Sequence, residues 1–280
     1  MKYSALDKLN LLANIYGRMF AAIFRFGTWS GFFYLGLFQA LGLFALTAFY
    51  LPGLYQVINP VIACFIPETM LHYPQYYIAL PSIYSALDNF VLGPTAWVIF
   101  SAFAVYRLSC YYSKEKSRPG IGLKIARGAY FRLFAFWALE TGLVLLAMAL
   151  PAAIASDFVA GSPNRKIALN LGLQFFAYGI SAFLIYTIPG VVAGSQKLGD
   201  ALRHSIILCK RNFFLTYSIV VFPSLIRVFT DFVLTEFSPR IVRLLNPEII
   251  VVILGIQILL GVFINLFIYG SAVFVYRELT

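Results

Sequence analysis

Six apolar stretches, each longer than 20 residues, constrain this sequence more than any other feature. A helix of about 20 residues spans the roughly 30 Å hydrocarbon core of a bilayer. Of the 280 residues, 61% are hydrophobic and 11% charged, whereas a soluble domain carries about 25% charged residues. The sequence therefore predicts an all-α polytopic membrane protein, with one domain over residues 1–280 and spans at residues 28–51, 89–111, 131–155, 167–193, 213–237 and 249–276.

The distribution of basic residues predicts the topology. Sixteen of the 21 Lys and Arg residues fall at the N-terminus, between spans two and three, between spans four and five, and at the C-terminus. The opposite side holds only Arg165, Lys166, Arg240 and Arg243. Because cytoplasmic loops are enriched in Lys and Arg, we expect both termini in the cytoplasm and the chain in the plasma (inner) membrane.

Three basic segments have the apolar periodicity of amphipathic helices: residues 4–25, a short helix beginning at Pro119, and residues 196–213. Such helices lie in the membrane interface, where a basic face can bind phospholipid headgroups. The candidate headgroup ligands are Arg18, Arg25, Lys124, Arg127, Arg203, Lys210 and Arg211. Alternatively, these charges only fix the orientation of the chain. Each segment precedes an aromatic-rich span, which suggests a threefold repeat, although any six-span protein with basic cytoplasmic loops shows the same alternation.

Residues 53–88 contain no Lys or Arg but carry several tyrosines and four prolines. Their apolar runs are too short to cross a bilayer. We therefore expect a long non-cytoplasmic loop with interfacial or re-entrant pieces, and a second span that begins only at Asn89. Pro94 would then lie in the first turns of that span, where a missing N–H is tolerated.

Polar side chains within the spans are the main candidates for function. Glu140 lies near the middle of span three, where an ionisable group costs at least ~2.5 kcal/mol. By helical rise, Gln39 and Asn265 lie at about the same depth. Arg227 and Asp231 are spaced to pair within span five. Gln257 lies near the depth of Arg227.

Two interpretations of these polar groups stay open. In the structural one, Arg227 and Asp231 neutralise each other, and Glu140 is paired or neutral inside the bundle. In the functional one, the groups line a polar pathway in which Glu140 takes up and releases a proton, because burial disfavours the charged carboxylate.

The sequence contains no catalytic motif of the common enzyme classes and only two histidines, His72 and His204. His72 beside Glu68 offers too few ligands for a metal, and Cys64, Cys110 and Cys209 lack the spacing of a zinc site or a disulfide framework. We therefore expect neither cofactor nor metal. Despite a net charge of +10, no nucleic-acid recognition module accompanies the basic residues. GxxxG spacings at Gly27–Gly31 and Gly190–Gly194 lie at span ends and are weak dimerisation signals.

The segment GDALRHSIILCKRNFFLTYSIVVF, residues 199–222, resembles the repeated span entry of the glycerophosphoryl diester phosphodiesterase membrane-domain superfamily, which includes YciC-like inner-membrane proteins. The matching positions are Ala201, Leu202, Arg203, Ser205, Lys210, Asn212 and Phe213. The resemblance implies six or more spans. It implies no hydrolase activity, because the catalytic barrel of some members is absent here, and it favours a role connected with lipids.

Taken together, the sequence favours a non-enzymatic accessory or scaffold protein that binds phospholipids or a membrane protein partner. The alternative is a small-solute or lipid transporter, or a channel subunit, with a polar pathway through Glu140. An intramembrane lipid enzyme is disfavoured, because no nucleophile–base or metal set is present.

Overall fold

The computed structural model describes residues 5–48, 72–155 and 161–279, together with single positions between 51 and 62. In these residues the chain is helical and contains no strand. The elements are α1 (Ala5–Ile23), α2 (Phe26–Thr47), α4 (Gln75–Leu87), η2 (Asp88–Trp97), α5 (Val98–Ser113), α6 (Pro119–Ile154), α8 (Pro163–Leu184), α9 (Thr187–Val192), α10 (Leu198–Arg211), α11 (Phe213–Leu244) and α12 (Ile249–Leu279).

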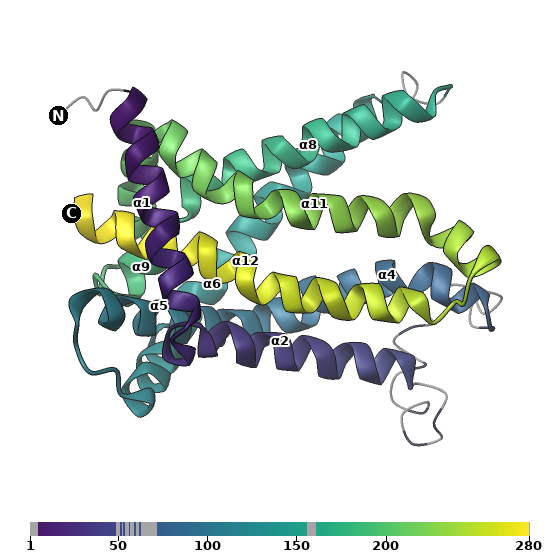
Figure 1. Ribbon diagram of the computed structural model, residues 1–280, viewed down its shortest axis with the longest axis horizontal. Coiled ribbons are helices and arrows are strands. Elements are labelled where there is room, and N and C mark those ends of the chain that lie inside the picture. Colours follow the sequence, from purple (N-terminus) through teal and green to yellow (C-terminus); the bar gives the residue numbers. More distant parts are fainter. Residues whose placement is uncertain are drawn as a thin grey trace.

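Six helical segments of the described chain are long and apolar enough to cross a membrane, which confirms the all-α polytopic class. They are Phe26–Thr47, Gln75–Ser113, Pro119–Ile154, Asn164–Val192, Phe213–Leu234 and Ile249–Leu279. Figure 1 shows α2, α12 and α11 running side by side, while α8 diverges from α11 toward one end. The helix α1 crosses the bundle at the end where α12 finishes.

The second membrane helix begins earlier than expected. Residues 75–113 form one continuous helix through α4, η2 and α5, so the predicted loop is wrong for residues 75–88. Most of residues 53–71, including Glu68 of the proposed pair with His72, lie outside the described residues. Ser82 and Ser85 of α4 and Asp88 of η2 interrupt the apolar run, so this part of the sequence does not form an uninterrupted apolar stretch. These three side chains line a cavity inside the bundle, which explains how they are accommodated.

Two other helices are longer than their predicted spans. The segment beginning at Pro119 is not a separate interfacial helix but the first part of α6, which continues to Ile154. Pro119 occupies the first turn, where proline is favoured. The helix α11 continues through Pro239 to Leu244, beyond the end at residue 237 that the sequence predicts for the fifth span.

The fourth span is interrupted where α8 meets α9. Pro189 has no N–H to donate to the carbonyl of Ile185, which is the helical partner of that position, and Ile185 and Tyr186 form a turn. Ser205 of α10 bridges the break: its hydroxyl donates to the carbonyl of Phe183 at 2.7 Å and accepts from the N–H of Tyr186 at 3.1 Å. Ser205 and Tyr186 are both buried, so these hydrogen bonds anchor α10 to the fourth span.

The protein itself covers part of the apolar faces of two amphipathic helices. In α1, Ile15, Met19 and Ala22 are fully buried, and Met19 contacts Gly270 of α12. In α10, Cys209 is fully buried, and burial raises the pKa of its thiol to about 11. The bundle therefore contacts these apolar residues, while Phe20 of α1 remains exposed; placement of the two helices at the membrane interface stays a prediction.

The GxxxG glycines also serve packing within the chain. A Cβ atom at Gly31 would lie 2.7 Å from Cβ of Ala104, so α2 and α5 are in backbone contact there. Gly190 and Gly194 similarly face Ala201 and the hydroxyl of Tyr276. Because these approaches are intramolecular, the motifs are used inside one chain.

Candidate functional site

Polar side chains from α2, α4, η2, α6, α8, α11 and α12 surround two neighbouring cavities inside the bundle. The first, the α11 cavity, has a volume of about 470 Å³ and is lined by residues that include Tyr84, Asp231 and Gln257. The second, the α6 cavity, has a volume of about 580 Å³ and is lined by residues that include Glu140. Asp88 and Arg227 line both cavities. We call the two cavities together the polar chamber.

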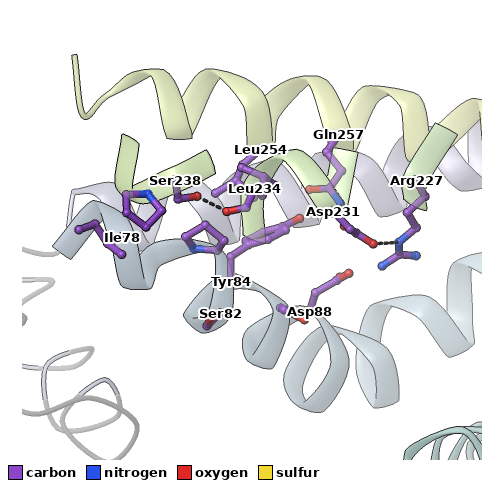
Figure 2. A pocket seen from close by; sticks show the side chains of 13 residues that line it. Ile78, Ser82, Tyr84, Asp88, Arg227, Asp231, Leu234, Ser238, Leu254 and Gln257 are labelled. Atoms are coloured by element: carbon purple, nitrogen blue, oxygen red, sulfur yellow. Dashed lines mark hydrogen bonds and ion pairs between the residues drawn. The ribbon is translucent and has the colours of Figure 1, made fainter. Parts of the chain in front are cut away.

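The Arg227–Asp231 pair predicted from the sequence lies in this chamber. Arg227 Nε is 3.9 Å from Asp231 Oδ2, and the Gln257 amide donates a hydrogen bond to Asp231. Figure 2 shows the three side chains gathered between α11 and α12. About half of the Arg227 side chain (54%) and 38% of the Asp231 side chain are accessible. The pair therefore borders open space and is not sealed in the core.

Asp88 is the main residue that the sequence interpretation missed. It lies at the junction of α4 and η2, where Gln39 Nε2 of α2 donates a hydrogen bond to its Oδ1 at 2.8 Å. In Figure 2 its carboxyl group points toward Arg227. The predicted outer loop includes this residue, although Ser82, Ser85 and Asp88 recur at three-residue spacing. This spacing is typical of one polar face of a helix, and it is the sequence feature that indicates a helix here.

Glu140 of α6 lines the α6 cavity together with Gln39 and Asn265, the two residues expected at its depth. Ser181 of α8 lines the same cavity. Arg227 also lines this cavity. The structure therefore brings all six polar candidates from the spans to the same chamber, and it adds Asp88 to them.

The wide helix η2 shapes one wall of the α6 cavity. Its π-helical turns contain Pro94, whose carbonyl accepts a hydrogen bond from the Tyr130 hydroxyl at 3.0 Å. A Cβ atom at Gly93 would lie 2.6 Å from Trp137 Nε1, so only glycine lets the indole approach. Pro94 thus lies inside a continuous helix and not in its first turns.

The chamber lining contains more acids than bases. Asp88, Asp231 and Glu140 face a single basic side chain, Arg227, among the residues that line the two cavities. An unbalanced charge in the membrane interior is costly, so the excess calls for protons, water or a cationic ligand. In the described part of the chain, no group of three His, Cys, Asp or Glu side chains could hold a metal ion.

Six of the predicted headgroup ligands lie on α1, α6 and α10, and Arg25 lies between α1 and α2; all seven are exposed. Two of them contact aromatic rings of the protein: the Arg18 guanidinium lies 4.7 Å from the ring centre of Phe274, and that of Arg25 lies 5.2 Å from Tyr111. Such contacts leave the guanidinium edges open to further donors and acceptors. Headgroup binding stays a prediction.

A comparison of the chain with protein-family models gives no match, and comparisons with curated proteins and with solved structures give none either. The resemblance of residues 199–222 to a membrane-domain superfamily therefore stays a prediction. The polar chamber is therefore the structural feature from which the function is inferred.

Proposed function

We propose that this protein is a membrane transport protein that carries a small polar or amphipathic solute through the polar chamber. The observation that supports this is the presence, between membrane-spanning helices, of cavities of about 470 and 580 Å³ lined by ionisable side chains. Binding pockets for small molecules have volumes of about 300–1,000 Å³. The cavities therefore favour transport over the scaffold role that the sequence alone favours.

A purely structural role for the polar residues would predict a different arrangement. Polar side chains that only hold helices together face one another in closed contacts. Here the Arg227–Asp231 pair borders a cavity, and Glu140 lines a second one. Open space beside ionisable groups in the membrane interior is typical of solute and proton pathways.

An accessory role connected with lipids is the second candidate, favoured by one specific observation. The exposed basic residues of α1 and α10, such as Arg18, Arg203 and Lys210, can contact anionic phospholipids, each contributing about 1 kcal/mol near a charged surface. This would hold the protein in the inner membrane with its basic end at the cytoplasmic leaflet. Such binding is compatible with transport.

Cysteine accessibility tests the transport proposal. In a background with the three native cysteines replaced by alanine, Ser85→Cys and Ser181→Cys place a thiol at the chamber. Reconstituted in liposomes, both should react with a charged, membrane-impermeant methanethiosulfonate reagent, because a water-filled chamber lets the thiolate form and the reagent enter. Leu146→Cys, at an exposed apolar position of α6, is the control and should stay unreactive in lipid.

The two outcomes are distinct. Reaction at the chamber positions alone supports a hydrated pathway, and reaction from either face in separate preparations supports alternating access. Chamber thiols as inert as Leu146→Cys from both faces would contradict the proposal and return the polar residues to a structural role.

A further inference from the structure

We infer that the solute of the polar chamber is an organic ammonium with an apolar tail, and that it enters from the lipid between α4–η2 and α6. This inference rests on the proposed function and names the substrate class of the same site. Three features of the chamber support it: its charge, its aromatic lining and the position of its walls.

The charge of the chamber selects a cation. Asp231 has its own partner in Arg227, at 3.9 Å. The Asp88 carboxylate accepts a hydrogen bond from the neutral amide of Gln39, and Glu140 shares its cavity with the neutral hydroxyl of Ser181. A bound cation would offset the net negative charge of the carboxyl groups, whereas a bound anion would add to that charge. Like charges brought together in a low-dielectric site repel strongly.

The aromatic lining favours an organic cation over a hydrated metal ion. Phe90, Trp97 and Trp137 line the α6 cavity together with Asp88 and Glu140. Aromatic rings attract alkylammonium groups through their negative faces, and rings combined with carboxylates are the usual means of recognising such ligands. Carboxylate ligands for a divalent metal would have to converge more closely than they do here.

The entrance that we infer for the α6 cavity lies between α4–η2 and α6. The helix α4 packs against α2, η2, α11 and α12, whereas α6 packs against α5, α8, α9, α10 and η2. The cavity lies between these two groups of helices, with Ser82 and Ser85 on one wall and Thr141 on the other.

The α6 wall continues from the polar groups to an apolar surface. Val144, Leu145 and Met148 line the cavity one to two turns beyond Glu140, and 47% of Leu145 is exposed. Since lipid covers the apolar surface of a membrane helix, an alkyl tail can lie along these side chains while its ammonium group contacts Glu140 and Asp88.

Binding measurements with matched amphiphiles test this inference. The protein in lipid nanodiscs would be titrated with decyltrimethylammonium, decyl sulfate and tetramethylammonium. We expect saturable binding of decyltrimethylammonium and at least about tenfold weaker binding of the other two, because one lacks the cation and the other lacks the tail. Equal binding of decyl sulfate would overturn the charge assignment, and equal binding of tetramethylammonium would overturn entry through the lipid.

Variants locate the site. Glu140→Gln and Asp88→Asn should each weaken decyltrimethylammonium binding by about tenfold or more, and Glu278→Gln, at an exposed position near the end of α12, should leave it unchanged. Trp137→Leu should weaken binding more than Trp137→Phe, which keeps an aromatic ring. Thermal unfolding of each variant would show whether that variant folds. If a variant does not fold, the titrations of the wild-type protein decide the inference.

The two proposals fail separately. Reactive chamber thiols without selective ammonium binding would refute the substrate class and leave transport standing. Unreactive thiols would refute both. Unchanged binding in folded Glu140→Gln and Asp88→Asn variants would show that the amphiphile binds elsewhere and would overturn the inference.

Discussion

At the scale of single residues, this protein places ionisable side chains in the membrane interior and gives Asp88, Asp231 and Arg227 specific neighbours. Gln39 and Gln257 present amide N–H donors to Asp88 and Asp231, and Arg227 pairs with Asp231 one helical turn away. Each partner offsets part of the cost of removing the charge from water. The pairing is partial, because the accessible Arg227 and Asp231 side chains border a cavity.

The Arg227–Asp231 pair gives a prediction about stability. Arg227→Leu should lower the free energy of unfolding by about 1–3 kcal/mol, between the values for exposed and buried pairs, because it leaves the Asp231 carboxylate without its cation. Adding Asp231→Leu should recover part of that loss, since both charges are then gone. A double-mutant cycle from denaturant unfolding in detergent measures this coupling. Additive effects of the two substitutions would show that the pair contributes nothing.

At the scale of secondary-structure elements, small residues bring the helices into backbone contact. Gly31 lets α2 approach α5, and Gly93 lets Trp137 of α6 rest on η2. Close approach of this kind is how membrane helices associate when no hydrophobic force drives them together. The glycines therefore position the walls of the chamber, although none of them carries a functional group.

Gly31→Ala should destabilise the protein by about 1–3 kcal/mol, because the added methyl group would lie 2.8 Å from the backbone nitrogen of Ala104 and cannot be accommodated without moving a helix. Gly142→Ala, in the middle of α6, is the matched control: no atom lies within 4 Å of its Cβ position. There alanine should be neutral or slightly stabilising. Thermal unfolding of both variants in the same detergent makes the comparison. Equal effects would mean that the α2–α5 contact is not tight.

At the scale of the whole molecule, an even number of membrane helices places both ends of the chain together. The helix α1 and the last turns of α12 lie at one end of the bundle, and Arg277 of α12 donates a hydrogen bond to the carbonyl of Ser109 in α5 there. Basic residues concentrate in the segments that meet at this end. The positive-inside rule predicts that this end faces the cytoplasm.

The topology can be tested in intact cells. In the cysteine-free background, Lys116→Cys should be protected from an impermeant thiol reagent added outside and should react after the cells are opened. Arg165→Cys, in the first turn of α8, should react from outside. Labelling in the opposite pattern would invert the orientation, and labelling of both positions from outside would contradict the six-span count.

The sequence by itself determined the membrane class, the six-span architecture and the concentration of basic residues in the segments that meet at one end of the bundle. These depend on runs of apolar residues and on the positions of Lys and Arg. Both are local properties of the sequence, and they decide which segments lie in lipid and which lie in water. Most of the chamber residues were also identifiable, because an ionisable side chain such as Glu140 is conspicuous in an apolar run.

Only the tertiary structure decided how these residues are used. It placed Asp88 inside a membrane helix, because the polar side chains of α4 face a cavity and not lipid, which is a property of the neighbouring helices. It covered part of the apolar face of α1 with α12, where the sequence alone could not distinguish protein from lipid as the apolar partner. It also opened space beside Glu140 and Arg227. Whether a buried charge is sealed or accessible depends on the packing of distant segments, and that packing turns scattered polar residues into a chamber.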